Sequence, residues 1–421
     1  IDHWRLTKLA DYGYKTKDVV GFGGLEEKYD YFLRQDEGAL SVEVDHRGRF
    51  VRALGFKPPK SGKDIILTLD LKIQKIVEEN LSNRKGGVII MDPYSGEIIA
   101  MANSPNFNPS IFVEKTNPSS FRYLFDDPES PLINRSISSG YPAGSLFKLI
   151  VATAALETGK INLFTEFLCN GSIHIGKQEF SCWNTHNQQN LMDAITHSCN
   201  VFFYKTGLLL GAKLIHDYAV KFAFAKPTAI DLPYETSGFV PSPFWKRFYR
   251  FSHQSGIPFF TGKNWFDGDT ANLAIGQGDL LVTPLQIARM MAVFANKGIL
   301  VTPYIVKAID GRDTSVYLKK TTRIFIKEST INYIRQALRN TVSEPTGTAS
   351  TLSDVAVSIA GKTGTAQVLR SQPHAWFVGF FPFQKPKFVI CVFLEHGGTG
   401  LNACVLAKQI IQSMCDGGLI D

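Results

Sequence analysis

Apolar residues recur with distinct spacings along the chain, and these spacings predict its secondary structure. Residues 65–70 form a short apolar run that predicts a strand, and its last residue, Asp70, can cap the helix that follows. In that helix, one face collects the apolar residues Ile73, Ile76, Val77 and Leu81. Two further runs, 87–91 and 97–101, are separated by turn-forming residues and predict a β-hairpin.

The remainder of the chain predicts one mixed domain. Residues 145–300 have a mainly helical pattern, strands return at 358–360, 375–380 and 388–394, and a last helix is expected at 403–414. Strands at both ends of a helical middle predict an α+β domain whose sheet joins segments that are distant in sequence.

The N-terminal 61 residues differ from the rest of the chain in their pattern of apolar and polar residues. Residues 41–45 alternate between apolar and polar and predict a half-exposed strand, followed by a turn at 46–48. Residues 57–62 contain two prolines and a glycine among polar residues, which is typical of a linker. We therefore expect a smaller N-terminal portion at 1–61 and the main domain at 62–421.

Composition and charge narrow the class of protein. The 421 residues are 44% hydrophobic and 20% charged, which excludes wholesale disorder and collagen-like order. The net charge of +7 is dispersed along the chain, so nucleic acid is not an expected partner, whereas an anionic membrane or cell-wall surface is compatible with it. No apolar run reaches the roughly 18 residues that span a bilayer. Because the chain does not begin with Met, we expect that a membrane anchor has been removed.

The candidate chemistry begins at Ser145-Leu146-Phe147-Lys148, which opens an apolar helix over 149–156. Residues three apart lie about one turn apart on the same helical face, so a neutral Lys148 could accept the proton of the Ser145 hydroxyl. Ser-x-x-Lys alone is common by chance, however, and a serine cap beside a solvated lysine is then the ordinary interpretation.

Two further segments favour a catalytic role for Ser145 and Lys148. Ser198-Cys199-Asn200 precedes an apolar run, and Lys362-Thr363-Gly364-Thr365 continues a predicted strand. Ser-x-x-Lys, Ser-Asp-Asn and Lys-Thr-Gly are the motifs of penicillin-binding proteins and of class A β-lactamases, and this chain has them in the same order with Cys199 in the middle of the second. We call them the first, second and third motifs.

The chain resembles class B penicillin-binding proteins over most of its length, and is most similar to the elongation-type penicillin-binding protein 2. Further segments that carry the resemblance are 134–135, 141–142, 274–278, 282–286, 347–349, 361–367 and 375–379, and for the elongation type 24–26, 29–30, 33–34, 241–242 and 245–246. The resemblance implies a transpeptidase domain with an antiparallel sheet flanked by helices and a smaller N-terminal pedestal. It also implies a bacterial inner-membrane protein whose catalytic domain is periplasmic.

The resemblance implies a serine D,D-transpeptidase that cross-links peptidoglycan stem peptides during cell-wall elongation and is acylated by β-lactams. Ser145 would be the nucleophile and Lys148 its base, Ser198 would relay a proton to the leaving nitrogen, and Asn200 would hold Lys148 or the donor amide. Lys362 would add positive charge. Thr363 and Thr365 would form hydrogen bonds with the donor peptide's carboxylate, and Gly364 would let the donor's backbone lie against the strand. No cofactor is expected for catalysis, and the expected partners are a membrane glycosyltransferase and elongation-complex proteins.

The sequence differs from the residues common in the family at Gln35, Ala143 and Leu146, where Gly, Pro and Thr respectively are usual. Leu146 adjoins the nucleophile, so substrate preference is the property most open to change. Two alternatives to a transpeptidase are a β-lactamase and a non-catalytic wall scaffold of the same fold. Residues 201–361 contain no Glu-x-x-Leu-Asn segment that would supply a β-lactamase with its deacylating base, and the intact motifs argue against a scaffold.

The cysteines allow two interpretations. Cys169 and Cys182 could form a disulfide in an oxidising compartment. Alternatively, Cys169, Cys182, His186 and Cys199 make a Cys3His set suited to a structural zinc ion, which some elongation-type relatives are thought to hold beside the second motif. We interpret Cys391, Cys404 and Cys415 as apolar filling.

Overall fold

The computed structural model describes residues 5–420 except 6, 8, 10, 12, 17, 113–118, 249, 252–257 and 260–263. The chain divides into two compact units. The first unit comprises Ile1–Thr68, Asp231–Tyr234 and Tyr304–Leu318, and the second comprises Leu69–Ile230, Glu235–Pro303 and Lys319–Asp421. We describe each unit by itself.

The first unit joins its three chain segments through a small sheet and a buried carboxylate. The sheet has the order β14-β13-β3. Asp231 accepts hydrogen bonds from the backbone N–H groups of Ile305 (2.8 Å) and Val306 (2.9 Å) and from the Tyr29 hydroxyl (2.8 Å). The elements of this unit are α2 Gly24–Lys28, α3 Asp30–Leu33, β1 Ala39–Val44, β2 Phe50–Lys57, β3 Ile65–Leu67, β13 Val306–Ile309, β14 Arg312–Asp313 and α12 Ser315–Leu318.

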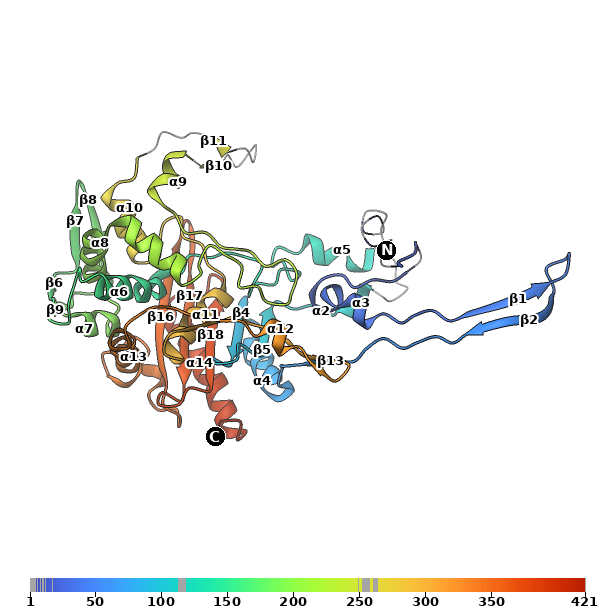
Figure 1. Cartoon of the computed structure of the whole chain (residues 1–421). Coiled ribbons are helices and arrows are strands. Elements are labelled where there is room, and N and C mark those ends of the chain that lie inside the picture. Colours follow the sequence, from blue (N-terminus) through green and yellow to red (C-terminus); the bar gives the residue numbers. More distant parts are fainter. Residues whose placement is uncertain are drawn as a thin grey trace. The chain divides into compact units, whose positions relative to one another are not determined.

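Strands β1 and β2 pair into a long antiparallel ribbon (Figure 1), which confirms the strand and the turn predicted at 41–48. The expectation that this strand is half-exposed is wrong, because its apolar residues Val42 and Val44 are also exposed. Alternation identifies which side chains share a face of a strand, but it does not supply the surface that would cover that face.

The second unit is built on a five-stranded antiparallel sheet with the order β16-β17-β18-β4-β5. Its strands are β4 Gly86–Met91, β5 Ile98–Ser104, β16 Ala360–Val368, β17 Ser371–Phe381 and β18 Phe388–Leu394. The sheet confirms the α+β class, the predicted hairpin and the joining of distant segments. One correction concerns the strand expected at 358–360, since β16 begins only at Ala360 and runs on through the third motif.

Helices cover both faces of this sheet (Figure 1). On one face, α4 Leu71–Leu81 and α14 Gly400–Asp416 enclose a hydrophobic core. Asp70 accepts hydrogen bonds from the backbone of Lys72 and Ile73 and so caps α4 as predicted. On the other face, the fully buried helix α11 Pro284–Ala295 contacts β4, β17 and β18. Strands β4, β17 and β18 are therefore covered on both faces, by α4 or α14 on one and by α11 on the other.

The region 145–300 is less uniformly helical than its pattern indicates, because four short strands occupy 167–189. These are β6 Phe167–Cys169 paired with β9 Asn187–Gln189 and β7 Ser172–Ile175 paired with β8 Gln178–Ser181. The remaining elements are η2 Pro109–Phe112, α5 Ser119–Asp126, η3 Gly144–Phe147, α6 Lys148–Glu157, α7 Leu191–Thr196, α8 Asn200–Lys221, α9 Pro243–Phe248, β10 Arg250–Phe251, β11 Pro258–Phe259, α10 Asp267–Ala274, β12 Ile299–Val301, β15 Thr321–Arg323, α13 Glu328–Ser343 and η4 Ser350–Leu352. Among the described residues, none of the helices combines the length and the apolar character that crossing a bilayer requires.

Candidate active site

The first motif lies where a 3-10 turn becomes a helix. Ser145 is half-buried in η3, and Lys148 is the fully buried first residue of α6. Gly144 has a φ of +54°, and a Cβ atom on it would lie 2.6 Å from the Thr365 carbonyl oxygen. Glycine at position 144 therefore lets the turn that carries the nucleophile lie directly against the third-motif strand.

Lys148 joins the first motif to the second. Its Nζ donates to the Ser198 carbonyl oxygen (2.7 Å), to Ser198 Oγ (3.3 Å) and to Asn200 Oδ1 (2.7 Å). Burial lowers the pKa of Lys148 to about 8, because desolvation disfavours the ammonium form. This lysine therefore loses its proton more readily than a solvated lysine, which suits a group that must accept a proton.

The second motif occupies the turn between α7 and α8. Ser198 has a φ of +55°, an unusual conformation for a serine, and the side chain of the next residue, Cys199, caps α8. Ser198 and Asn200 both contact Lys148, whereas Cys199 is fully buried beside Cys169, Cys182 and His186. The side chains on either side of Cys199 therefore contact the proposed base, and that of Cys199 itself does not.

The third motif lies on β16, the edge strand of the sheet. Lys362 is fully buried, and desolvation together with the charge of Lys148 lowers its pKa. Thr363 Oγ1 is hydrogen-bonded to Thr348 Oγ1 (2.8 Å), and Thr365 Oγ1 accepts from the Gly400 backbone (2.9 Å). A Cβ atom on Gly364 would lie 3.0 Å from Leu146 Cγ and 3.1 Å from Trp376 Cβ, so this glycine is also required for packing against the nucleophile's turn.

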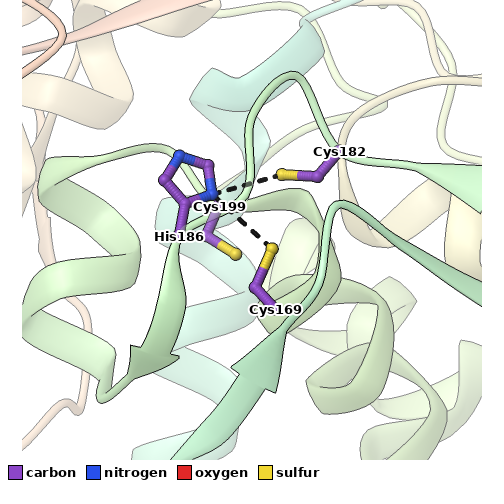
Figure 2. A group of neighbouring side chains, drawn as sticks. All are labelled: Cys169, Cys182, His186 and Cys199. Atoms are coloured by element: carbon purple, nitrogen blue, oxygen red, sulfur yellow. Dashed lines mark hydrogen bonds between the residues drawn. The ribbon is translucent and has the colours of Figure 1, made fainter.

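The predicted cysteine and histidine set forms one cluster (Figure 2). The ligand atoms of Cys169, Cys182, His186 and Cys199 all lie within 4.8 Å of one another. His186 Nδ1 is 3.6 Å from Cys169 Sγ and 3.5 Å from Cys182 Sγ. All six cysteines of the chain are free thiols, so the alternative of a Cys169–Cys182 disulfide is not what the structure contains.

The chemistry of this donor set fits a zinc ion, since three thiolates and one imidazole are a common tetrahedral ligand set for Zn²⁺. The hydrogen bond between Cys199 and Cys182 lowers the pKa of Cys182 and raises that of Cys199, so without a metal the thiolate is favoured at Cys182. The cluster also touches the second motif, because the Asn200 backbone N–H donates to Cys182 Sγ (3.1 Å).

Several contacts around the site had no signal in the sequence patterns. Gln277 Nε2 lies 3.5 Å from the Thr365 carbonyl oxygen, and Trp376 Nε1 donates to the Pro142 carbonyl oxygen (3.1 Å). Both residues belong to segments that carry the family resemblance, which was the only indication of them. Thr348 also lies in such a segment. His197 adjoins Ser198, and no pattern or motif predicted a role for it.

The chain is similar to known proteins over most of its length. Residues 86–412 match the penicillin binding protein transpeptidase domain family, and residues 1–67 match the penicillin-binding protein dimerisation domain family. The peptidoglycan D,D-transpeptidase MrdA of Acinetobacter baumannii is 32% identical, over 94% of this chain and 60% of that protein. MrdA of Escherichia coli K12 is 30% identical, over 96% of this chain and 65% of that protein. The chain thus spans less than two thirds of the length of these two relatives.

Two solved structures are similar to the whole chain. The complex between penicillin-binding protein PBP2 and MreC from Helicobacter pylori aligns with a TM-score of 0.87 at 28% identity, covering 99% of this chain and 76% of the other. Pseudomonas aeruginosa PBP2 in complex with WCK 5153 aligns with a TM-score of 0.85 at 28% identity, covering 100% and 86%.

Proposed function

The chain belongs to the penicillin-binding protein transpeptidase family, and we propose that it is a serine D,D-transpeptidase that cross-links peptidoglycan stem peptides during cell-wall elongation. The observation that carries this proposal is the buried Lys148, which lies three residues after Ser145 and donates to both Ser198 and Asn200. A lysine held in this way, with its pKa lowered to about 8, suits a general base for a serine nucleophile.

In the proposed acylation, Ser145 Oγ attacks the carbonyl carbon between the last two D-alanines of the donor peptide, while Lys148 Nζ accepts the hydroxyl proton. The backbone N–H groups of Ser145 and Thr365 stabilise the developing oxyanion. The C–N bond then breaks, Lys148 passes its proton by way of Ser198 to the leaving D-alanine nitrogen, and an ester to Ser145 remains. Asn200 holds Lys148 in position throughout.

In the proposed second half-reaction, the amine of a neighbouring stem peptide attacks the ester carbonyl carbon and loses a proton to Lys148. The C–O bond to Ser145 breaks, the serine oxygen regains a proton, and a new peptide cross-link forms. Lys362 contributes positive charge that favours neutral Lys148 and attracts the donor carboxylate, which Thr363 and Thr365 bind by hydrogen bonds.

We also propose that Cys169, Cys182, His186 and Cys199 hold a structural zinc ion. Zinc bound by four protein ligands is closed to water and contributes to folding rather than to the chemical step. The backbone hydrogen bond from Asn200 to Cys182 would couple the stability of this cluster to the position of the second motif.

The cellular setting is part of the same proposal. Residues 1–61 are a pedestal and linker and 62–421 the transpeptidase domain, located in the periplasm of a bacterium and anchored to its inner membrane. Elongation-complex proteins and a membrane glycosyltransferase are the proposed partners. Support comes from two similar solved structures, one a complex of PBP2 with MreC and the other a peptidoglycan synthase complex that coordinates polymerization and crosslinking.

The proposal is tested by incubating the protein with a stem peptide that ends in D-alanyl-D-alanine and with an amine acceptor peptide. We expect release of one D-alanine for each cross-linked product, and none from Ser145→Ala. Release of D-alanine without any cross-linked product, together with rapid turnover of penicillin, would instead identify a hydrolase of the β-lactamase type.

A further inference from the structure

The loop that follows α13 connects the second and third motifs. The Thr348 backbone N–H donates to the Thr196 carbonyl oxygen (3.3 Å), two residues before Ser198. The Thr348 hydroxyl is hydrogen-bonded to that of Thr363 in the third motif (2.8 Å). Thr348 thus touches both the segment that carries the second motif and the strand that carries the third.

His197 makes a second connection to the same loop, and its hydrogen bonds define its tautomer. Gln189 Nε2 donates to the carbonyl oxygens of His186 and Gln188, both at 2.9 Å, so Gln189 Oε1 faces His197 Nδ1 at 3.0 Å. Because an amide oxygen can only accept, His197 Nδ1 carries the hydrogen. In the neutral ring, Nε2 is then an acceptor, and the Thr346 hydroxyl donates to it (3.1 Å).

These connections matter because of the conformation of Ser198. Its φ of +55° places it in the left-handed region, which is strained for a residue with a Cβ atom. Such a conformation persists only where the surroundings fix the chain on both sides. On the C-terminal side, the Asn200 backbone N–H donates to Cys182 Sγ. On the N-terminal side, His197 and Thr196 are held by the 346–348 loop.

We propose that His197 and Thr348 are positioning residues for transpeptidation. His197 is hydrogen-bonded to Thr346 and thereby fixes the position of its neighbour Ser198. Thr348 orients the Thr363 hydroxyl. The inference rests on the proposed function, because it assigns Ser198 to proton transfer and Thr363 to the donor carboxylate. The two residues therefore act on different steps, His197 on the rate of acylation and Thr348 on binding before acylation.

The hydroxyl chemistry of Thr348 explains its effect on binding. A hydroxyl has one hydrogen and two lone pairs, so Thr363 can donate to a carboxylate only when Thr348 becomes the donor in their shared hydrogen bond. Thr348 would then orient the Thr363 hydrogen toward the bound carboxylate. A valine at position 348 has a similar shape but cannot donate, and it leaves the Thr363 hydroxyl without this orienting partner.

The test of Thr348 measures acylation by benzylpenicillin over a range of concentrations, which separates the dissociation constant before acylation from the acylation rate constant. We expect Thr348→Val to weaken binding about three- to tenfold, as for one hydrogen bond, with the rate constant nearly unchanged. Thr348→Ser should restore binding because it restores the hydroxyl. Parental binding by Thr348→Val, or failure of Thr348→Ser to restore it, would overturn the role of Thr348.

The test of His197 is a double-mutant cycle on the acylation rate constant. His197→Asn can still donate to Gln189 but cannot reach Thr346, and Thr346→Val removes the same hydrogen bond from the other side. We expect each variant to slow acylation by a similar factor, up to about tenfold, and the double variant to be no slower than either. Multiplicative effects, or no effect of Thr346→Val, would overturn the role of His197.

Two controls keep these outcomes distinct. Ser343→Ala removes an exposed hydroxyl at the end of α13, which donates to the Arg339 carbonyl oxygen, and it should leave both constants unchanged. Melting temperatures identify any variant that fails to fold, and Thr346 is exposed enough that its valine variant should fold. A parent protein that penicillin does not acylate would contradict the proposed function, whereas normal acylation of both the parent and the variants would contradict only this inference.

Discussion

Lys148 Nζ lies 2.7 Å from Asn200 Oδ1, and this hydrogen bond joins the helix of the proposed nucleophile to the second motif. The lysine is fully buried, so its charge is costly and its pKa falls to about 8. The pairing explains how an Asn from a distant segment could hold a base that would otherwise be mobile. It also makes the lysine sensitive to changes in its neighbours.

Replacing the two buried lysines should slow acylation to different extents. Lys148→Ala removes the proposed proton acceptor, and loss of a general base commonly costs about 10²- to 10⁴-fold in rate. Lys362→Ala removes only a charge that biases its neighbours, so we expect a smaller loss. Stopped-flow measurement of penicillin acylation compares the two. A rate for Lys148→Ala close to that of the parent would refute its role as the base.

The pH dependence of acylation should follow the titration of Lys148. Only the neutral amine can accept a proton, so the acylation rate should rise with pH, change slope near pH 8 and level off above it. A profile that is flat between about pH 6 and 9 in the parent protein would contradict this assignment.

Gly144→Ala should damage both stability and acylation. The new Cβ atom would meet the Thr365 carbonyl oxygen at 2.6 Å, and the left-handed φ of +54° would add strain of about 1–2 kcal/mol. Gly159→Ala is the matched control, since Gly159 has a φ of +67° but nothing within 4 Å of its Cβ position. We expect the control to lower the melting temperature slightly and to keep its acylation rate. Equal effects of the two substitutions would show that the close approach to β16 is unimportant.

The proposed zinc site predicts about one zinc ion per chain in the purified protein, measured by elemental analysis. Cys182→Ser should lower the zinc content and the melting temperature, because metal binding contributes to folding. It should also slow acylation, because Asn200 loses its backbone contact with the sulfur.

Cys415→Ser is the control for this substitution, since Cys415 is half-buried and lies outside the cluster. It should change neither the zinc content nor the acylation rate. A parent protein without zinc whose mass is lower by two hydrogens would favour a Cys169–Cys182 disulfide over the proposed metal site.

Local signals predicted much of the second unit. Asp70 followed by the apolar face of α4, the turn between β4 and β5, and the apolar run of β18 each specify an element through neighbouring residues alone. The three motifs could also be identified from the sequence, because each is a short segment of fixed spacing. The cluster of Cys169, Cys182, His186 and Cys199 was predicted as a set, since two of its members are only four residues apart.

Long-range contacts account for what the sequence patterns did not indicate. Residues 231–234 and 304–318 belong to the first unit, although they are far along the chain from the rest of it. His197 and Thr346 are 149 positions apart, and neither belongs to a periodic pattern or to a motif. The short strands β6 to β9 were missed because three or four residues are too few to display a period.

The central claim is that Ser145 is the nucleophile of an acyl transferase, and intact-mass measurement after incubation with penicillin tests it most directly. We predict a long-lived increase equal to one penicillin per chain, located by peptide mapping on Ser145, and no increase in a folded Ser145→Ala protein. Undiminished labelling of Ser145→Ala, or no labelling of the parent protein, would contradict the account.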